Sequence, residues 1–132
     1  SATVETWLED HGYRVPGVSA GRNSVDTRIG GNTRYDTALL AADYAVDMST
    51  FDDSSLYVAT GTNWPDALAL APVAGLGETP LLLVDGAEIG KSAAVARYLI
   101  RRQSDVPTLA FVGGDGAVTP YVRGQIRVAL GQ

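Results

Sequence analysis

The chain has 132 residues, a formal net charge of −5 and a hydrophobic content of 45%. This length and composition predict one folded domain and exclude a disordered chain. No apolar run approaches the roughly 20 residues of a membrane-spanning helix, so no membrane insertion is expected. The absence of cysteine excludes structural disulfides and thiolate metal sites.

The charge is unevenly distributed along the chain. Residues 1–86 hold 12 acids and 4 bases, whereas residues 87–132 hold 3 acids and 6 bases. A DNA-binding domain is normally basic over a whole face, so we expect no nucleic-acid partner. We interpret the basic final third as a solvated helix face, and a local anionic partner is the alternative.

Catalytic signals are weak. His11, the only histidine, lies in "LEDHGYR", which is typical of a helix end followed by a glycine stop. The "GKS" at 90–92 lacks the earlier glycine of a phosphate-binding loop. The sequence therefore predicts no catalytic residues, no metal site and no cofactor.

The first part of the chain differs from the rest. Residues 3–12 read as a short helix, followed by a long connection with one candidate strand at 25–29. Such a long connection is unusual inside a compact domain. We interpret residues 1–27 as a tail helix and linker, of this domain or of a preceding unit, and residues 28–132 as one complete domain.

Apolar strands and amphipathic helices alternate along the remaining residues. The strands, at 55–60, 79–84 and 107–113, are nearly continuous in hydrophobicity, as in strands covered on both faces. The helices are expected at 33–48, 63–75 (interrupted near Pro72), 91–103 and 119–130. This alternation predicts an α/β fold, a small parallel-sheet layer with helices on both faces.

The spacing also predicts which sides of two helices are buried. In the helix at 33–48, Tyr35 and Leu39 begin an apolar stripe. In the helix at 91–103, the inward residues are expected to be Val95, Ala96, Leu99 and Ile100, with the arginines outward.

Helix starts carry recognisable capping residues. In "ATGTNWPDALAL" (59–70), Gly61 permits a sharp turn, Asn63 falls at the predicted N-cap, and Asp66 follows three residues later. We predict a structural capping role for Asp66, with direct ligand contact as the alternative. Thr33 and Asp36 have the same spacing, and Thr119 precedes Pro120 as an N-cap.

The stretch "VGGDGAVTP" (112–120) is a strand end, a glycine turn and a helix start, where backbone N–H groups can bind anions. It lacks the third glycine of a dinucleotide-binding fingerprint, so that signal is weak. A small-ligand site at the ends of parallel strands stays open.

Four blocks of sequence together resemble the type 2 cell-wall-binding repeat. They are "RY-x-TA" (34–38), "ATG-x-NWPDAL" (59–68), "PLLLV" (80–84) and "VGG" (112–114) with Ala117 and Val118. The resemblance covers roughly residues 28–130. It implies a Rossmann- or Toprim-like layer, found as three tandem repeats packed with approximate threefold symmetry on exported proteins of Gram-positive bacteria.

The resemblance also implies a function. Such repeats anchor surface proteins non-covalently to an anionic secondary cell-wall polymer, teichoic-acid-like or other. The protein is thus expected to be secreted and located at the cell wall, with sister repeats or a homotrimer as partners. Candidate polymer-binding residues are Arg28, Arg34, Asn63, Trp64, Leu83, Val84, Lys91, Gly113 and Gly114.

Two of these residues have alternative interpretations. Arg34 can instead form an ion pair that fixes the first helix, and Trp64 can pack as a helix-start staple instead of stacking on sugar rings. Two other function classes stay open for the chain. One is an enzyme domain that acts on a phosphorylated small molecule, and the other is a purely structural repeat that mediates trimeric assembly.

Overall fold

The computed structural model describes residues 6–7, 10–11, 29–47, 51–52, 54–103, 106 and 108–132. Contacts divide the chain into two units, Ser1–Gly30 and Gly31–Gln132. In the first unit the rings of Trp7 and His11 stack with centroids 4.0 Å apart, and the His11 N–H donates to the Trp7 carbonyl oxygen (3.2 Å). Several expected features lie outside the described residues. They are Arg28, the candidate strand at 25–29 apart from Ile29, and most of the helix expected at 3–12.

Helices and strands alternate through the second unit. In chain order they are α2 (Arg34–Asp47), β1 (Ser55–Thr60), α3 (Pro65–Leu76), β2 (Leu81–Val84), the short 3₁₀ helix η1 (Ile89–Ser92), α4 (Ala93–Arg101), β3 (Thr108–Val112) and α5 (Pro120–Ala129). The strands are made of β-branched and aliphatic residues that suit a covered, pleated surface. Each strand and helix predicted between residues 33 and 130 is present within two residues of its expected bounds, and η1, which precedes α4, was not predicted.

The three strands form one parallel sheet in the order β2-β1-β3. In the register, Tyr57 of β1 lies opposite Leu81 of β2 on one side and Ala110 of β3 on the other. The prediction of an α/β fold with a parallel-sheet layer is therefore confirmed.

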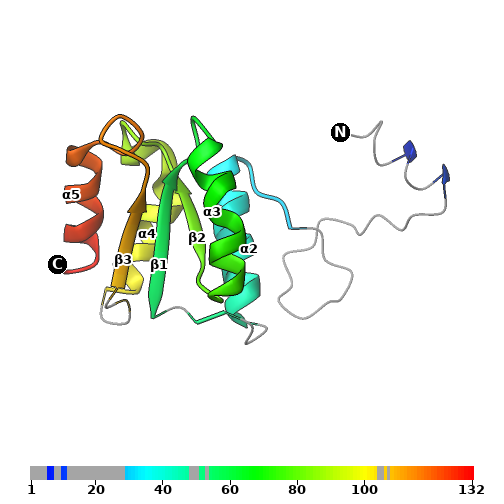
Figure 1. Cartoon of the computed structure of the whole chain (residues 1–132), viewed down its shortest axis with the longest axis horizontal. Coiled ribbons are helices and arrows are strands. Elements are labelled where there is room, and N and C mark those ends of the chain that lie inside the picture. The colour runs from blue at the N-terminus through cyan, green and yellow to red at the C-terminus, as the bar shows by residue number, and fades with distance from the viewer. Residues whose placement is uncertain are drawn as a thin grey trace. The chain divides into compact units, whose positions relative to one another are not determined.

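The helices cover both faces of the sheet (Figure 1). α3 contacts all three strands, whereas α2 and α4 contact β2 and each other, and α5 contacts α4. The chain route explains this arrangement. The β1-α3-β2 crossover moves toward one edge of the sheet, and the β2-α4-β3 crossover moves back toward the other. Because parallel crossovers share one hand, opposite directions place α3 and α4 on opposite faces.

The hydrophobic core lies on the face that α2, α4 and α5 cover. Alternate strand residues point to the same face, and Leu56, Val58, Leu82 and Val84 are fully buried. They pack in one cluster with Tyr35, Leu39, Val95, Leu99, Val122 and Ile126 from the three helices. The largest buried side chains of the unit thus stabilise one side of the sheet.

The other face is covered by α3 with small side chains. Only Ala67 and Ala74 of this helix are buried. The interruption predicted near Pro72 is wrong, because α3 continues through Pro72 to Leu76. Proline removes one helical hydrogen bond, to the carbonyl group of Leu68. Leu68 and Pro72 are both exposed, so water can satisfy that carbonyl group.

One predicted inward residue also points outward. Ile100 is 55% exposed, whereas Tyr98 is buried with Val95 and Leu99. α4 is short and contacts the core through a narrow stripe at i, i+3 and i+4, which leaves Ile100 beyond its edge. The expectation for Ile100 was wrong.

Candidate functional site

The connections that leave β1 and β3 diverge at the carboxyl ends of these neighbouring strands. The chain leaves β1 for α3 on one face and leaves β3 for α5, which packs into the core of the other face. In open parallel sheets this topological switch point is where ligands bind. We define the C-terminal edge as the loops that follow the strands, at residues 61–64, 85–88 and 113–119.

The start of α2 is attached to this edge by two side chains. Arg34 donates from Nη1 to the carbonyl oxygen of Gly61 (2.7 Å), at the end of β1. The next residue, Tyr35, donates its hydroxyl to Oδ2 of Asp85 (3.4 Å), at the end of β2. Arg34 therefore connects the start of α2 to the end of β1 through a backbone carbonyl group. This contact is neither the ion pair nor the polymer contact expected for Arg34.

A reciprocal pair of hydrogen bonds fixes the first turn of α2. The Thr33 N–H donates to Oδ2 of Asp36 (3.0 Å), and the Asp36 N–H donates to Oγ1 of Thr33 (3.1 Å). This is the geometry of a capping box. α5 begins similarly, since Thr119 is its N-cap and accepts from the N–H of Val122 (3.4 Å).

Asp85 is a buried carboxylate at the end of β2. Its Oδ1 accepts from the backbone N–H groups of Ala87 (3.0 Å) and Glu88 (2.8 Å). Burial alone would raise the pKa of Asp85, but these two N–H groups, the charge of Lys91 and the Tyr35 hydroxyl together hold the pKa below its ordinary value of 3.8. Asp85 therefore stays charged and holds the loop after β2 against α2.

Arg123 of α5 holds the loop after β3. It donates from Nε to the carbonyl oxygen of Val118 (2.8 Å) and from Nη2 to that of Gly113 (2.9 Å). Its Nη1 also lies 3.4 Å from Oδ1 of Asp115, and the guanidinium lies over the Phe111 ring at 5.5 Å. A planar donor group with several N–H bonds in fixed directions suits this loop-closing contact.

Gly113 approaches Asp66 at the switch point itself. Gly113 has φ +95°, a conformation that favours glycine, and a Cβ atom there would collide with Oδ2 of Asp66. The carboxylate of Asp66 thus lies over the glycine turn, between β1 and β3.

α3 begins one residue later than predicted. Its N-cap is Trp64 rather than Asn63, which places Asp66 at the second helical position. Within the described part of the chain, Asp66 makes no side-chain hydrogen bond to the free N–H groups of this turn, so the expected capping bond is not seen. Its charge still lies at the positive end of α3, where a carboxylate is favourable.

The exposed candidate residues lie along the loops of this edge. Asn63 is exposed, and Trp64 is 69% exposed, so Trp64 does not pack as a helix-start staple. Lys91 is exposed and paired with Glu88 (3.0 Å). Gly114 is exposed next to Gly113, in the loop that leads to α5.

The two apolar candidates lie on β2. Val84 is fully buried and Leu83 is partly buried against the core cluster. The structure corrects the expectation that Val84 contacts the polymer. Its side chain points into the core, where a polymer cannot reach it. The apolar segment 80–84 instead builds the edge strand that presents Asp85.

Sequence reasoning missed Asp85, Arg123 and the role of the Tyr35 hydroxyl. A signal for Asp85 was present, since an acid directly followed by glycine ended an apolar strand in "LLLVDG". Nothing in the local sequence of Arg123 distinguished it from the other helical arginines, because its partners lie in a loop that only the fold brings near.

No group of three or more histidine, cysteine, aspartate or glutamate side chains capable of holding a metal ion occurs among the residues described. The described helices are all too short or too polar to cross a bilayer. Asp85, Arg123 and the Lys91–Glu88 pair at the C-terminal edge bind backbone groups or each other. What remains for a ligand is the exposed turn of Thr62, Asn63 and Trp64, with Arg34 beside it.

This arrangement defines an α/β module with an exposed turn at the switch point of its sheet. A comparison with protein families matches residues 28–123 to cell wall binding domain 2. The match covers most of the chain, and the protein belongs to this family. A comparison with curated proteins found no match. A cell-wall-binding role follows from the family, and with it an association with the cell wall or cell surface.

Proposed function

We propose that this module binds an anionic secondary polymer of the cell wall and anchors an exported protein there without a covalent bond. The observation that carries the proposal is the family membership over residues 28–123. The exposed Asn63–Trp64 turn at the switch point gives the place where we expect the polymer to bind.

The charge of the module constrains how such binding works. The net charge is −5, and Asp66 and Asp85 lie at the same edge as the exposed turn, so an anionic polymer meets no broad basic surface there. Sugar rings packed on the Trp64 indole supply apolar contact without charge. Arg34 and Lys91 supply local positive charge, and an exposed ion pair is worth at most about 1 kcal/mol.

Weak single-site binding is compatible with firm anchoring when several modules act together. Linked sites along one polymer convert later binding events into intramolecular ones, which multiplies the apparent affinity. We therefore include sister repeats or further copies of the chain, in a homotrimer, in the proposed functional unit.

A pull-down on Gram-positive cell walls tests the proposal. The purified chain is mixed with intact walls and with walls from which acid has extracted the secondary polymers, and soluble extracted polymer serves as the competitor. Binding to intact walls that disappears after extraction and is competed by the polymer is the expected result. Equal binding to both wall preparations, or none by a folded sample, contradicts the proposal.

A salt series in the same assay separates charge from apolar contact. Because the basic groups near the turn are few, we expect affinity to fall only modestly with salt. A steep loss would show that arginines elsewhere on the module carry the binding instead of the Trp64 turn.

One observation favours a second candidate function. The glycine turn at Gly113 lies at the switch point and leads into α5, and small phosphorylated ligands bind at such places in other α/β domains. A rise in melting temperature with nucleotides or sugar phosphates, but not with wall polymer, would favour this enzyme-like alternative. Assembly without affinity for either ligand would favour a purely structural repeat.

A further inference from the structure

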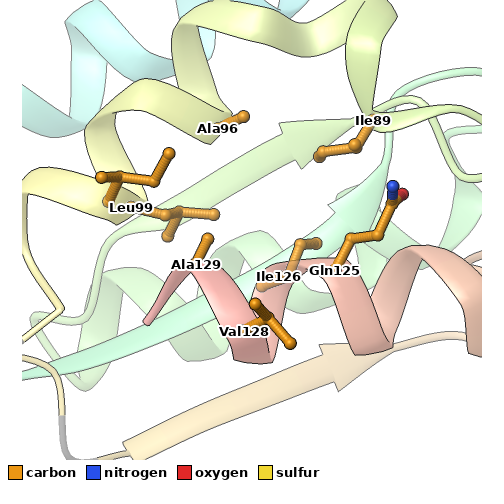
Figure 2. Close-up of a pocket in the computed structure, with 8 residues that line it drawn as sticks. Ile89, Ala96, Leu99, Gln125, Ile126, Val128 and Ala129 are labelled. Atoms are coloured by element: carbon orange, nitrogen blue, oxygen red, sulfur yellow. The ribbon is translucent and has the colours of Figure 1, made fainter. Parts of the chain in front are cut away.

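An apolar groove lies between α4 and α5. Its side chains line a cavity of about 330 Å³, a size that suits a small apolar group (Figure 2). Ile100 of α4 and Val128 of α5 line this cavity and are also 55% and 75% exposed, so they form its rim. We call this surface the α4–α5 groove.

Tyr121 extends the apolar rim along α5. It lies about two helical turns before Val128, so both side chains leave the same side of the helix. Tyr121 is exposed, and its apolar ring and polar hydroxyl suit a boundary between an apolar phase and water. We call Ile100, Tyr121 and Val128 the apolar strip. Single exposed apolar residues are normal, whereas a group around a groove marks a site of interaction.

Arginines lie on both sides of the apolar strip. Arg97 precedes Ile100 by three residues, so the two side chains are neighbours on α4. Arg127 adjoins Val128 on the side of α5 away from the groove, with its guanidinium over the Phe111 ring at 5.5 Å. Both arginines are exposed. We call Arg97 and Arg127 the flanking arginines.

The surroundings of the groove are basic although the chain as a whole is acidic. α4 with Arg102, and α5, contain five arginines and no acid. Of the acids in the loops before these helices, Glu88 is paired with Lys91 (3.0 Å) and Asp115 with Arg123 (3.4 Å). This side of the module therefore attracts an anionic partner.

The groove also holds a buried acceptor. The Gln125 side chain, which points from α5 toward Ile89 in Figure 2, donates from Nε2 to the Tyr121 hydroxyl (3.2 Å). Its Oε1 is buried and has no hydrogen-bond partner in the part of the chain described. Buried acceptors are normally paired. An occupant that brings a hydroxyl group, such as the glycerol headgroup of a phospholipid, supplies the missing donor.

We propose that the α4–α5 groove docks on the surface of an anionic phospholipid membrane. The apolar strip enters the boundary between headgroups and acyl chains, and the flanking arginines bind headgroup phosphates. A polymer of sugars and phosphates would use the arginines but would leave the apolar strip in water, so the strip favours lipid. The contact goes beyond the proposed polymer binding, because it uses α4 and α5 and not the Asn63–Trp64 turn.

Flotation with lipid vesicles tests the proposal. The full chain is mixed with vesicles made of equal parts of phosphatidylglycerol and phosphatidylcholine, or of phosphatidylcholine alone. We expect the chain to float with the anionic vesicles and not with the neutral ones. Binding is expected to weaken as the salt concentration rises, because salt screens the attraction between the arginines and the phosphates.

Two variants separate apolar contact from charge. The strip variant carries Ile100→Ser and Val128→Ser, and the arginine variant carries Arg97→Gln and Arg127→Gln. Each is expected to lower the partition of the chain onto anionic vesicles about 10-fold or more. Arg97→Lys with Arg127→Lys keeps the charge and is expected to retain most of the binding.

A matched control for the strip variant lies on other helices. Leu40 of α2 and Leu68 of α3 are also exposed apolar residues, and neither lines the groove. Leu40→Ser with Leu68→Ser is therefore expected to bind vesicles like wild type. All substituted side chains are exposed, so the variants are expected to fold, which circular dichroism checks.

Three results would overturn the inference. The first is a wild type that does not float with anionic vesicles, and the second is equal flotation with neutral vesicles. The third is loss of binding in the arginine variant with none in the strip variant, which would mean that the arginines bind phosphate in any anionic polymer. Wall pull-down identifies this third case, because the arginine variant would then also lose wall binding.

Discussion

The two faces of the sheet are built differently. On the α2, α4 and α5 side, leucine, valine and isoleucine side chains are fully buried in one cluster. On the α3 side, the buried helical residues are two alanines, and Leu68, Val73 and Leu76 of the helix are exposed. Both sides contain many apolar residues, but only the α2, α4 and α5 side buries its large apolar side chains in the core.

The contrast indicates that one face supplies most of the core and the other leaves apolar side chains exposed. A helix that is hydrophobic all round is usually buried on all sides. α3 has that composition and is covered on one side only. Substitutions should therefore lower the free energy of unfolding strongly on the first face and weakly on the outer side of α3.

Truncation of a core leucine should have the largest effect. Leu82 is fully buried on the α2–α4 face, and Leu82→Ala is expected to lower the free energy of unfolding by about 3 kcal/mol. Leu76→Ala, at the exposed end of α3, is expected to change this free energy by less than about 0.5 kcal/mol. Urea unfolding of dilute samples measures both. Similar losses would show that the α3 face also stabilises a single copy.

Substitution of Gly86 tests how tightly the loop after β2 packs against the loop after β3. A Cβ atom at Gly86 would collide with the backbone oxygen of Ala117, and the Thr119 N–H donates to the Gly86 carbonyl oxygen (2.9 Å). Gly86→Ala is therefore expected to cost about 2 kcal/mol, because backbone must move. Gly114→Ala in the opposing loop, where a Cβ meets no neighbour, is the matched control and should cost much less.

Asp85 should make the free energy of unfolding depend on pH in the acid range. Because its pKa is lowered by folding, its charge stabilises the fold above the ordinary value of 3.8, and that contribution is lost as the pH falls through the lower folded value. Asp85→Asn is expected to cost about 2 kcal/mol at neutral pH, through weakened N–H bonds, and to flatten the pH dependence of stability below about pH 4. Urea unfolding at several pH values measures both effects.

Tyr35→Phe provides a graded control for Asp85. It removes only the long hydroxyl contact (3.4 Å) and keeps the ring in the core, so its effect should stay below about 1 kcal/mol. A pH dependence in Asp85→Asn as steep as in wild type would mean that other carboxylates control the acid response.

The elements could be predicted from the sequence because local signals and burial agreed. Apolar runs set the three strands, and Thr119 with Pro120 marked the start of α5. α3 was harder to predict. Its composition is nearly uniform, so no periodicity showed that Leu68 and Leu76 would face solvent, and Pro72 suggested a break that an exposed carbonyl group does not require.

The candidate site could be predicted only in part. The turn around Asn63 and Trp64 was recognisable from its motif, and it is exposed as expected of a binding turn. The contacts of Arg34 and Arg123 to backbone carbonyl groups could not be predicted, because their partners are 27 and 10 residues away and meet them only in the folded sheet. Side-chain burial decided against Val84, which the motif alone had suggested.

Trp64 should have the smallest effect on stability and the most informative effect on binding. It is exposed at the C-terminal edge, where α3 begins, so Trp64→Ala is expected to change the free energy of unfolding by less than about 0.5 kcal/mol, yet to weaken wall binding. Leu76→Asp is the matched control, since Leu76 is also exposed but lies at the other end of α3.

Wall pull-down of the two variants distinguishes a polymer contact at the turn from one along the whole of α3. If Trp64→Ala loses wall binding and Leu76→Asp keeps it, the indole contacts the polymer directly. If both lose binding, the polymer contact extends from the turn along the exposed side of α3. Unchanged binding by Trp64→Ala would move the polymer site away from this turn. Asn63, Arg34 and Lys91 would then have to be tested one by one.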